Sequence, residues 1–237
     1  LPLRQILAVC VLGLLFLGLI MVQSATPHVN DHVGWALTNV GEKHAAFVGL
    51  SIITFFLVGR FDYRRLNRKL SVTNPVLWLL ILALAMSGLV LLPHVGREVN
   101  GARRWLGVGP VQVQPSELAK WAVVLFLAWW LSSRENALAT FKGLLLVLLP
   151  VAAICFLIAK EDFGTAALIG LASIAILLVA DVKWWHLAII IPPAAAAARF
   201  SVVHKSYRMQ RMTAFLNPWA DPRGIGYHMI QSLLSFS

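Results

Sequence analysis

Seven apolar runs, separated by shorter polar segments, dominate the pattern of residues along this chain. They are Ile6–Val22, Ala45–Val58, Pro75–Leu92, Leu118–Leu131, Gly143–Ala159, Gly164–Ala180 and Trp184–Ala198. A helix needs about 20 apolar residues to cross about 30 Å of hydrocarbon, and flanking Trp, Tyr, Arg and Lys extend the shorter runs at the interface. No run has the two-residue alternation of a barrel strand. We therefore predict one all-α domain over residues 1–237, a polytopic transmembrane helical bundle with seven spans.

Composition supports a membrane protein. The chain is 59% hydrophobic and only 13% charged, so it has too little polar surface for a soluble fold of this length. The first run could instead be a cleaved signal peptide, but it is long for that role and six further runs follow it. The chain begins with Leu1 rather than Met and ends within a patterned segment, so we interpret it as a fragment.

Basic residues predict how the bundle is oriented. The loop after the second run contains Arg60, Arg64, Arg65, Arg68 and Lys69. Cytoplasmic loops are enriched in Lys and Arg, so this loop and the N-terminus are predicted to be cytoplasmic. Alternation then places residues 23–44, 93–114, 160–163 and everything after Arg199 outside. The chain has a net charge of +10, and the outer tail after Arg199 is itself basic. Positive charge on the outer face indicates either an anionic ligand or a long translocated loop that escapes the enrichment of Lys and Arg in cytoplasmic loops.

The second outer segment leads into a helix with a charged first turn. Pro115 is typical of a first helical position, and Glu117 and Lys120 lie three apart on one face. Ionisable residues at the start of a span usually face a bundle interior or a water-filled cavity. The alternative is a structural ion pair near the interface, with Lys120 extending outward. Arg103 and Arg104, just upstream, favour a functional role.

Other candidates are weaker. Asp162 could cap a helix or line a polar groove, and its spacing does not decide between the two. Cys10 and Cys155 lie in apolar runs and are interpreted as small hydrophobic residues. His28 and His32 have no third ligand nearby, so a metal site is not predicted. The pair Pro192-Pro193 predicts a kinked or broken helix.

Three motifs resemble those of one family. They are GARRWLGVGPVQVQPSELAK, EDFGTA and YRMQRMTAFLNPWADPRGIGYHMIQS, in this order and on one side of the membrane. Together they resemble the SEDS family of peptidoglycan polymerases, the FtsW, RodA and SpoVE group. The resemblance covers the chain from about Arg97 onward, and the preceding runs fit the topology. The run TAFLNPWADP is more similar to the division-type FtsW branch than to the RodA branch.

The resemblance implies a glycosyltransferase. Such an enzyme polymerises lipid II into glycan strands at the outer face of the bacterial cytoplasmic membrane, in cell division or shape maintenance. Its implied partners are a class B penicillin-binding transpeptidase and other division or elongation proteins, and no nucleic acid. No cofactor is implied, although a divalent cation at the diphosphate stays open. A flippase for lipid-linked precursors and a non-enzymatic division scaffold are the alternatives.

The resemblance also implies a site. The expected substrate-binding residues are Arg104, Glu117, Lys120, Asp162, Arg208, Arg211 and Asp221. The pair Glu117 and Lys120 would line a central cavity. The family's credited catalytic acid lies in a Thr-Asp-Phe motif downstream of a Gly-rich stretch, beyond Ser237, so the catalytic residue is unknown here. The fragment, with seven of roughly ten expected spans, is expected to be inactive. Glu161 stands where the family commonly has proline, so the loop before Asp162 is expected to bend differently.

Overall fold

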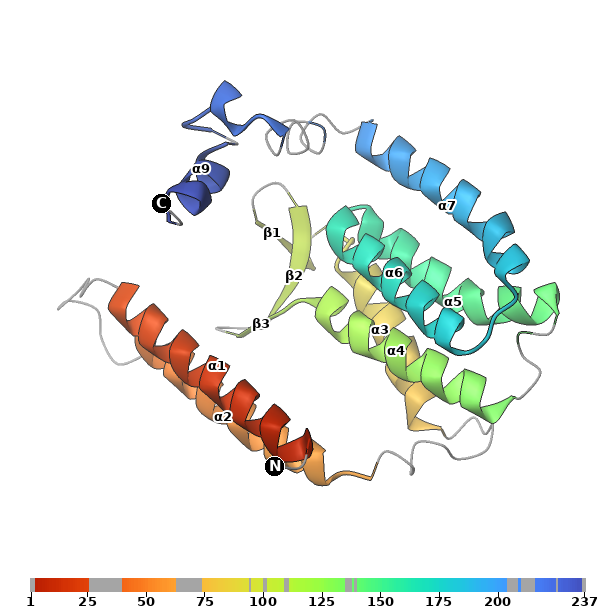
Figure 1. The fold of residues 1–237 in the computed structure, drawn as a ribbon, viewed down its shortest axis with the longest axis horizontal. Coiled ribbons are helices and arrows are strands. Elements are labelled where there is room, and N and C mark those ends of the chain that lie inside the picture. The colour runs from red at the N-terminus through yellow and green to blue at the C-terminus, as the bar shows by residue number, and fades with distance from the viewer. Residues whose placement is uncertain are drawn as a thin grey trace. The chain divides into compact units, whose positions relative to one another are not determined.

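The structure is a computed structural model that describes most of the chain. The described residues are 3–25, 40–62, 74–93, 95–99, 102–108, 111–134, 138, 140–203, 209, 216–224 and 226–235 (Figure 1). Contacts divide the chain into two compact units, Leu1–Tyr63 and Arg64–Ser237, and each is described by itself. The sequence predicts that both units belong to one domain over residues 1–237, and this stays a prediction.

The first unit is a hairpin of two helices, α1 (Leu3–Ala25) and α2 (Val40–Arg60). Both are long and apolar enough to cross a membrane. Their large apolar side chains are exposed along the helices, for example Phe16 on α1 and Leu57 on α2. Exposing so much apolar surface to water is unfavourable, whereas exposing it to lipid is not.

The second unit is a bundle whose core lies among four helices. These are α3 (Pro75–Leu89), α4 (Pro115–Ser133), α5 (Phe141–Ala159) and α6 (Phe163–Val179), which pack side by side (Figure 1). The most deeply buried core side chains include Ala83, Ala122, Leu127, Val147 and Ile154. Small residues at Ala83 and Ala122 allow close approach of helices, as is common in membrane bundles.

A fifth helix, α7 (Trp184–Val203), joins the bundle through its first turn. Leu187 of this turn packs in a second cluster with Leu144 and Leu177, from α5 and α6. Pro192 and Pro193 lie inside the helix, and its helical assignment continues through them. Of the two outcomes expected at these prolines, a kink or a break, the break does not occur.

All seven apolar runs fall on helices α1 to α7, so the helical polytopic class that the sequence predicts is confirmed. Among the described helices, α1, α2 and α5 meet the length and hydropathy of a membrane span, while α3 and α6 are shorter apolar helices. The number of spans therefore stays a prediction. Helix α3 ends at Leu89, before the apolar run Pro75–Leu92 does, because the chain turns at Val90.

Local capping explains where several helices begin. The Asn74 side chain accepts the Val76 N–H at 2.9 Å ahead of Pro75, which occupies the first helical position of α3. The Thr140 hydroxyl similarly accepts the Gly143 N–H at 3.2 Å at the start of α5. Such caps satisfy backbone donors that have no partner within the helix.

A small sheet follows α3 and was not predicted. Strands β1 (Gly96–Val99), β2 (Ala102–Val108) and β3 (Val111–Val113) pair antiparallel in that order. The alternating valines and glutamines of this segment, bounded by glycines, are a strand signal that the sequence analysis passed over. Strand β2 pairs with β3 only from Leu106 onward, so the first part of β2 extends past its neighbour.

The tail after α7 contains a turn and a short helix. The turn helix η2 (Pro218–Ala220) leads to α9 (Tyr227–Leu234). The Asp221 carboxylate accepts the Gly224 N–H at 3.0 Å, and the Asp221 carbonyl accepts the Gly226 N–H at 3.1 Å. A Cβ atom at Gly226 would collide with the Pro218 carbonyl, so the turn requires glycine there. Trp219 and Leu216 are exposed beside it.

Candidate functional site

A small pocket, with room for about one water molecule, lies where four helix ends meet strand β2. The last turn of α3, the first of α4 and the turn between α5 and α6 form its walls together with β2. Its lining residues are Ser87, Val90, Leu91, Arg103, Arg104, Pro115, Ser116, Leu157, Ile158, Glu161 and Asp162. The helix ends thus gather charged and hydroxyl side chains around this pocket, at one end of an otherwise apolar bundle.

Two serines contribute buried hydroxyls to the pocket. Ser87 is 2% exposed and Ser116 is 6% exposed. The Ser87 hydroxyl has no hydrogen-bond partner in the described part of the chain. A buried hydroxyl without a partner is costly, so Ser87 is a position where a single water molecule in the pocket would be stabilising.

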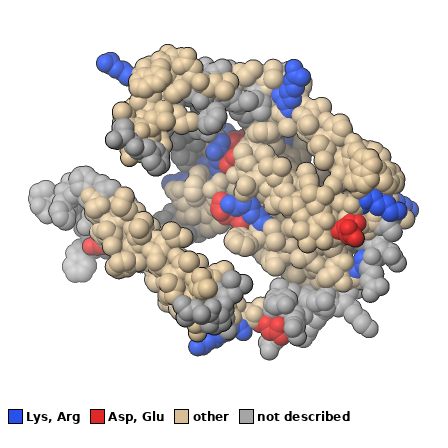
Figure 2. All heavy atoms as spheres, in the orientation of Figure 1, with Lys and Arg blue, Asp and Glu red and all other residues tan. Residues whose placement is uncertain are grey.

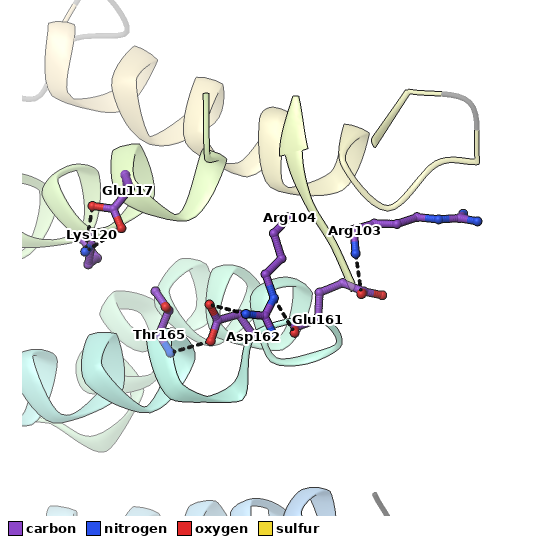
Figure 3. A network of polar contacts seen from close by, with 7 residues as sticks. All are labelled: Arg103, Arg104, Glu117, Lys120, Glu161, Asp162 and Thr165. Carbon is purple, nitrogen blue, oxygen red and sulfur yellow. Dashed lines mark hydrogen bonds and ion pairs between the residues drawn. The ribbon is translucent and has the colours of Figure 1, made fainter. Parts of the chain in front are cut away.

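Arg104 crosses the pocket from β2 to the α5–α6 turn (Figure 3). Its Nη1 atom lies 3.6 Å from Oδ2 of Asp162, and its Nε atom donates to the Glu161 carbonyl oxygen at 3.0 Å. The Asp162 side chain is only 19% exposed, which screens this ion pair less than a surface pair. Arg104 and Asp162, which the sequence analysis assigned to one site, are therefore in contact.

Asp162 also caps α6. Its Oδ1 atom accepts the Thr165 N–H at 3.1 Å, while Oδ2 faces Arg104. The two functions that the sequence left open for Asp162 are therefore compatible, because each carboxylate oxygen has its own partner. A carboxylate at a helix N-terminus is also favoured by the helix dipole.

Arg103 is held from two sides. Its backbone N–H donates to Oε2 of Glu161 at 2.9 Å, and its Nε atom lies 3.5 Å from Oε2 of Glu98 on β1. Glu161 thus contacts two consecutive residues of β2. The turn that carries it is closed by its own N–H, which donates to the Ile158 carbonyl at 3.1 Å, a bond that proline could not make.

The charges that line the pocket are balanced. Arg103 and Arg104 each contact a carboxylate, and the pocket's own acids are Glu161 and Asp162. Their formal charges cancel, so the pocket is not a basic anion site. Its volume of about 20 Å³ holds about one water molecule, for which the lining offers both donors and acceptors.

Glu117 and Lys120 form a separate pair on α4 (Figure 3). The Lys120 Nζ atom lies 2.9 Å from Oε1 and 2.8 Å from Oε2 of Glu117. The Glu117 side chain is 56% exposed, and neither residue lines the pocket. Within the described chain, no hydrogen bond or ion pair joins them to the Arg104 group. The predicted pairing is thus found, while their predicted place in a central cavity stays a prediction.

Of the remaining predicted site residues, the structure describes only Asp221. Asp221 is exposed and holds the turn before α9. Arg208 and Arg211 lie outside the described residues, as do His28 and His32. Sequence reasoning did not propose Glu161 or Ser87 as site residues. Glu161 was visible as a departure from the family pattern, and Ser87 as a polar residue inside an apolar run.

Charged residues are sparse on the visible surface. Figure 2 shows mostly uncharged atoms on this face, with Lys, Arg, Asp and Glu confined to a few places. Among the described residues, no group of three or more His, Cys, Asp or Glu could hold a metal ion. The two cysteines are free, and Cys155 donates weakly to the Ala166 carbonyl at 3.7 Å. Among the described residues, the candidate site groups are therefore those around the pocket and the pair of Glu117 and Lys120.

Known proteins resemble this chain over most of its length. The "Probable peptidoglycan glycosyltransferase FtsW" of Nitrosococcus halophilus is 34% identical over 228 residues, which cover 94% of this chain and 57% of the relative. A protein of the same name from Halorhodospira halophila is 42% identical over 159 residues, or 66% of this chain and 40% of the relative. The chain thus spans about half the length of the curated relatives it matches.

Solved structures agree with the sequence relatives. A chain of a peptidoglycan synthase complex, described as coordinating polymerization and crosslinking, matches with a TM-score of 0.69 at 29% identity, over 94% of this chain and 61% of that one. The Thermus thermophilus rod shape determining protein RodA matches with a TM-score of 0.57 at 29% identity, over 79% of this chain and 56% of RodA. The polytopic helical membrane fold is therefore shared with these proteins.

The family profile that matches this chain settles the resemblance drawn from the three motifs. The profile is described as "Cell cycle protein" and covers residues 4–237. The FtsW-named relatives favour the FtsW branch, as the TAFLNPWADP run predicts. The resemblance is thereby confirmed, and the chain belongs to the FtsW/RodA/SpoVE family of membrane proteins, the SEDS family.

Proposed function

We propose that the protein is a peptidoglycan glycosyltransferase that polymerises lipid II into glycan strands. The observation that carries the proposal is the set of relatives named peptidoglycan glycosyltransferase FtsW, which align with nearly the whole chain. The match to a chain of a peptidoglycan synthase complex supports the same reaction. The proposal includes a place in cell division, because the named relatives are of the FtsW branch.

The charged groups at the edge of the pocket would contact part of such a substrate. Lipid II combines a sugar portion with a diphosphate and a long lipid. Arg104, held beside Asp162 at the edge of the pocket, would contact the sugar portion and fix its orientation. The exposed apolar faces of the helices would accept the lipid chain. We assign no residue of the chain as the base for the acceptor hydroxyl.

The diphosphate would lie outside this pocket. Arg103 and Arg104 already contact carboxylates, so they carry little uncompensated positive charge for an anion. Arg208 and Arg211 of the basic tail remain the proposed diphosphate ligands, since Arg binds phosphate oxygens through paired N–H groups. Lys120 would join them only if its pair with Glu117 opens.

The proposed setting is the bacterial cytoplasmic membrane. The basic loop after α2 supports a cytoplasmic N-terminus, which would place the pocket at the outer face. A class B penicillin-binding transpeptidase is the proposed partner. The description of the similar synthase complex, in which polymerization and crosslinking are coordinated, supports that partner.

One assay tests this function against its rivals. The protein, purified at its natural length, is incubated with labelled lipid II, and glycan chains are separated by size. Polymer that is lost in Arg104→Ala and kept in Lys142→Ala supports the enzyme. Lys142 is the matched control because it is an exposed cation at the first turn of α5, away from the pocket.

The other outcomes identify the alternatives. Transfer of lipid II across vesicles without polymer would identify a flippase. Binding of a transpeptidase with neither polymer nor transfer would identify a scaffold. Either result would refute the proposed glycosyltransferase activity.

A further inference from the structure

We propose that Glu161 is a positioning residue, which holds strand β2 against the α5–α6 turn and so places Arg104 beside Asp162. Its carboxylate accepts the Arg103 N–H at 2.9 Å, and its carbonyl oxygen accepts Arg104 Nε at 3.0 Å. The consequence for catalysis rests on the proposed function, but the positioning itself does not.

The position of Arg103 on β2 explains why a side chain is needed there. Strand β3 pairs with β2 only from Leu106 to Val108, so it does not reach Arg103. Strand edges present backbone groups that need partners. The Glu161 carboxylate supplies one from a segment 58 residues further along the chain. A hydrogen bond to an ionised acceptor is about twice as strong as a neutral one.

The same contact adds to the strand pairing that fixes which way Arg104 points. Side chains on a strand alternate between faces, so a one-residue slip of β2 would turn Arg104 away from the pocket. Glu161 contacts two consecutive residues of β2, one at the backbone and one at the guanidinium. This double contact opposes such a slip and keeps Arg104 Nη1 at 3.6 Å from Asp162.

The turn that carries Glu161 is itself well anchored. The N–H groups of Glu161 and Asp162 both donate to the Ile158 carbonyl, at 3.1 Å and 2.7 Å. Asp162 then caps α6 through Thr165. Glu161 therefore extends from a firmly hydrogen-bonded turn, as a positioning residue requires.

Hydrogen–deuterium exchange of the Arg103 amide tests the positioning directly. The protein is placed in lipid nanodiscs, and exchange is followed in peptides that span Arg103. Glu161→Ala removes the acceptor, and we expect exchange at Arg103 to become about tenfold faster. Glu161→Gln keeps an oxygen acceptor and should stay within about threefold of the wild type. Unchanged exchange in Glu161→Ala would overturn the proposal.

Two further variants keep the test sharp. Glu161→Met preserves side-chain volume without the acceptor, so it should accelerate exchange at Arg103 as Glu161→Ala does. It replaces Glu161→Ala in the test if that variant folds poorly. Glu98→Gln alters the other acid beside Arg103, which meets its side chain rather than its N–H. Exchange at Arg103 should then be unchanged. An equal acceleration in Glu98→Gln would contradict a specific role for Glu161.

An activity measurement connects the positioning to the reaction. At natural length, Glu161→Ala should polymerise lipid II at least about fivefold more slowly, and Glu161→Gln should restore the rate. Equal rates in wild type and Glu161→Ala would refute the role in catalysis. A wild-type protein that forms no polymer would instead refute the proposed function and leave the exchange result unaffected.

Discussion

Arg104 and Asp162 face one another across the pocket, with Nη1 of the guanidinium 3.6 Å from Oδ2 of the carboxylate. The second carboxylate oxygen of Asp162 simultaneously accepts the Thr165 N–H. One side chain therefore connects strand β2 to the start of α6. Any change at Asp162 affects both a site contact and a helix cap, and the two effects can be separated by the choice of substitution.

Two substitutions of Asp162 should separate its effect on stability from its effect on activity. Asp162→Asn keeps an oxygen that caps α6 but loses the charge that faces Arg104. Asp162→Ala loses both, so it should lower the free energy of unfolding by about 1 kcal/mol more than Asp162→Asn. Both variants should lose lipid II polymerisation. Thermal unfolding in detergent measures the first effect, and identical unfolding temperatures for the two variants would contradict the cap.

Glu117 and Lys120 should matter more for activity than for stability. Their pair is exposed, so a double-mutant cycle should give a coupling below about 1 kcal/mol. The charge-reversed double variant Glu117→Lys, Lys120→Glu restores attraction between the two positions. If the pair binds substrate, that variant stays folded and inactive in the polymerisation assay. Recovery of activity on charge reversal would identify a purely structural pair.

Gly226 should not tolerate a side chain. Gly226→Ala would push a methyl group into the Pro218 carbonyl, and the turn held by Asp221 would have to open. We expect faster proteolytic cleavage between η2 and α9. Gly170→Ala is the matched control, because a Cβ there meets nothing within 4 Å. It should be neutral or slightly stabilising, since alanine favours helix by about 1 kcal/mol over glycine.

Asp181 should prefer replacement by glycine. Its φ of 62° lies in the left-handed region, just after α6, where Val182 N–H donates to the Leu177 carbonyl. Glycine adopts this conformation without strain and is common at helix C-termini. Asp181→Gly should keep or raise the unfolding temperature, whereas the branched Asp181→Val should lower stability by about 1–2 kcal/mol. Equal unfolding temperatures for both variants would argue against the strain.

The helices could be predicted because their causes are local. Apolar runs such as Gly143–Ala159 coincide with helices, and Pro115 begins α4 as its position predicts. The Glu117–Lys120 pair also follows from spacing, since residues three apart share a helical face. The sheet escaped prediction because its strands are short, three to seven residues, and lie between long apolar runs.

The pocket could not be predicted from the residues alone. Family resemblance gathered Arg104 and Asp162 into one site, but nothing local indicates that a carboxylate at Glu161 binds the Arg103 backbone 58 residues away. The unpartnered hydroxyl of Ser87 is equally invisible in the sequence, because the pocket it lines is formed by segments far apart along the chain. These contacts arise only when α3 to α6 pack together.

The sequence by itself determined the class of protein, the helical segments, the local ion pair on α4 and, through its motifs, the family. These depend on hydropathy and on spacings within a few turns of helix. Tertiary structure decided the contact between Glu161 and strand β2, the double use of Asp162 and the charge balance that leaves the pocket neutral. The physical reason is range: helix formation and capping involve neighbours along the chain, whereas the partner of each pocket charge is chosen by how distant helix ends meet.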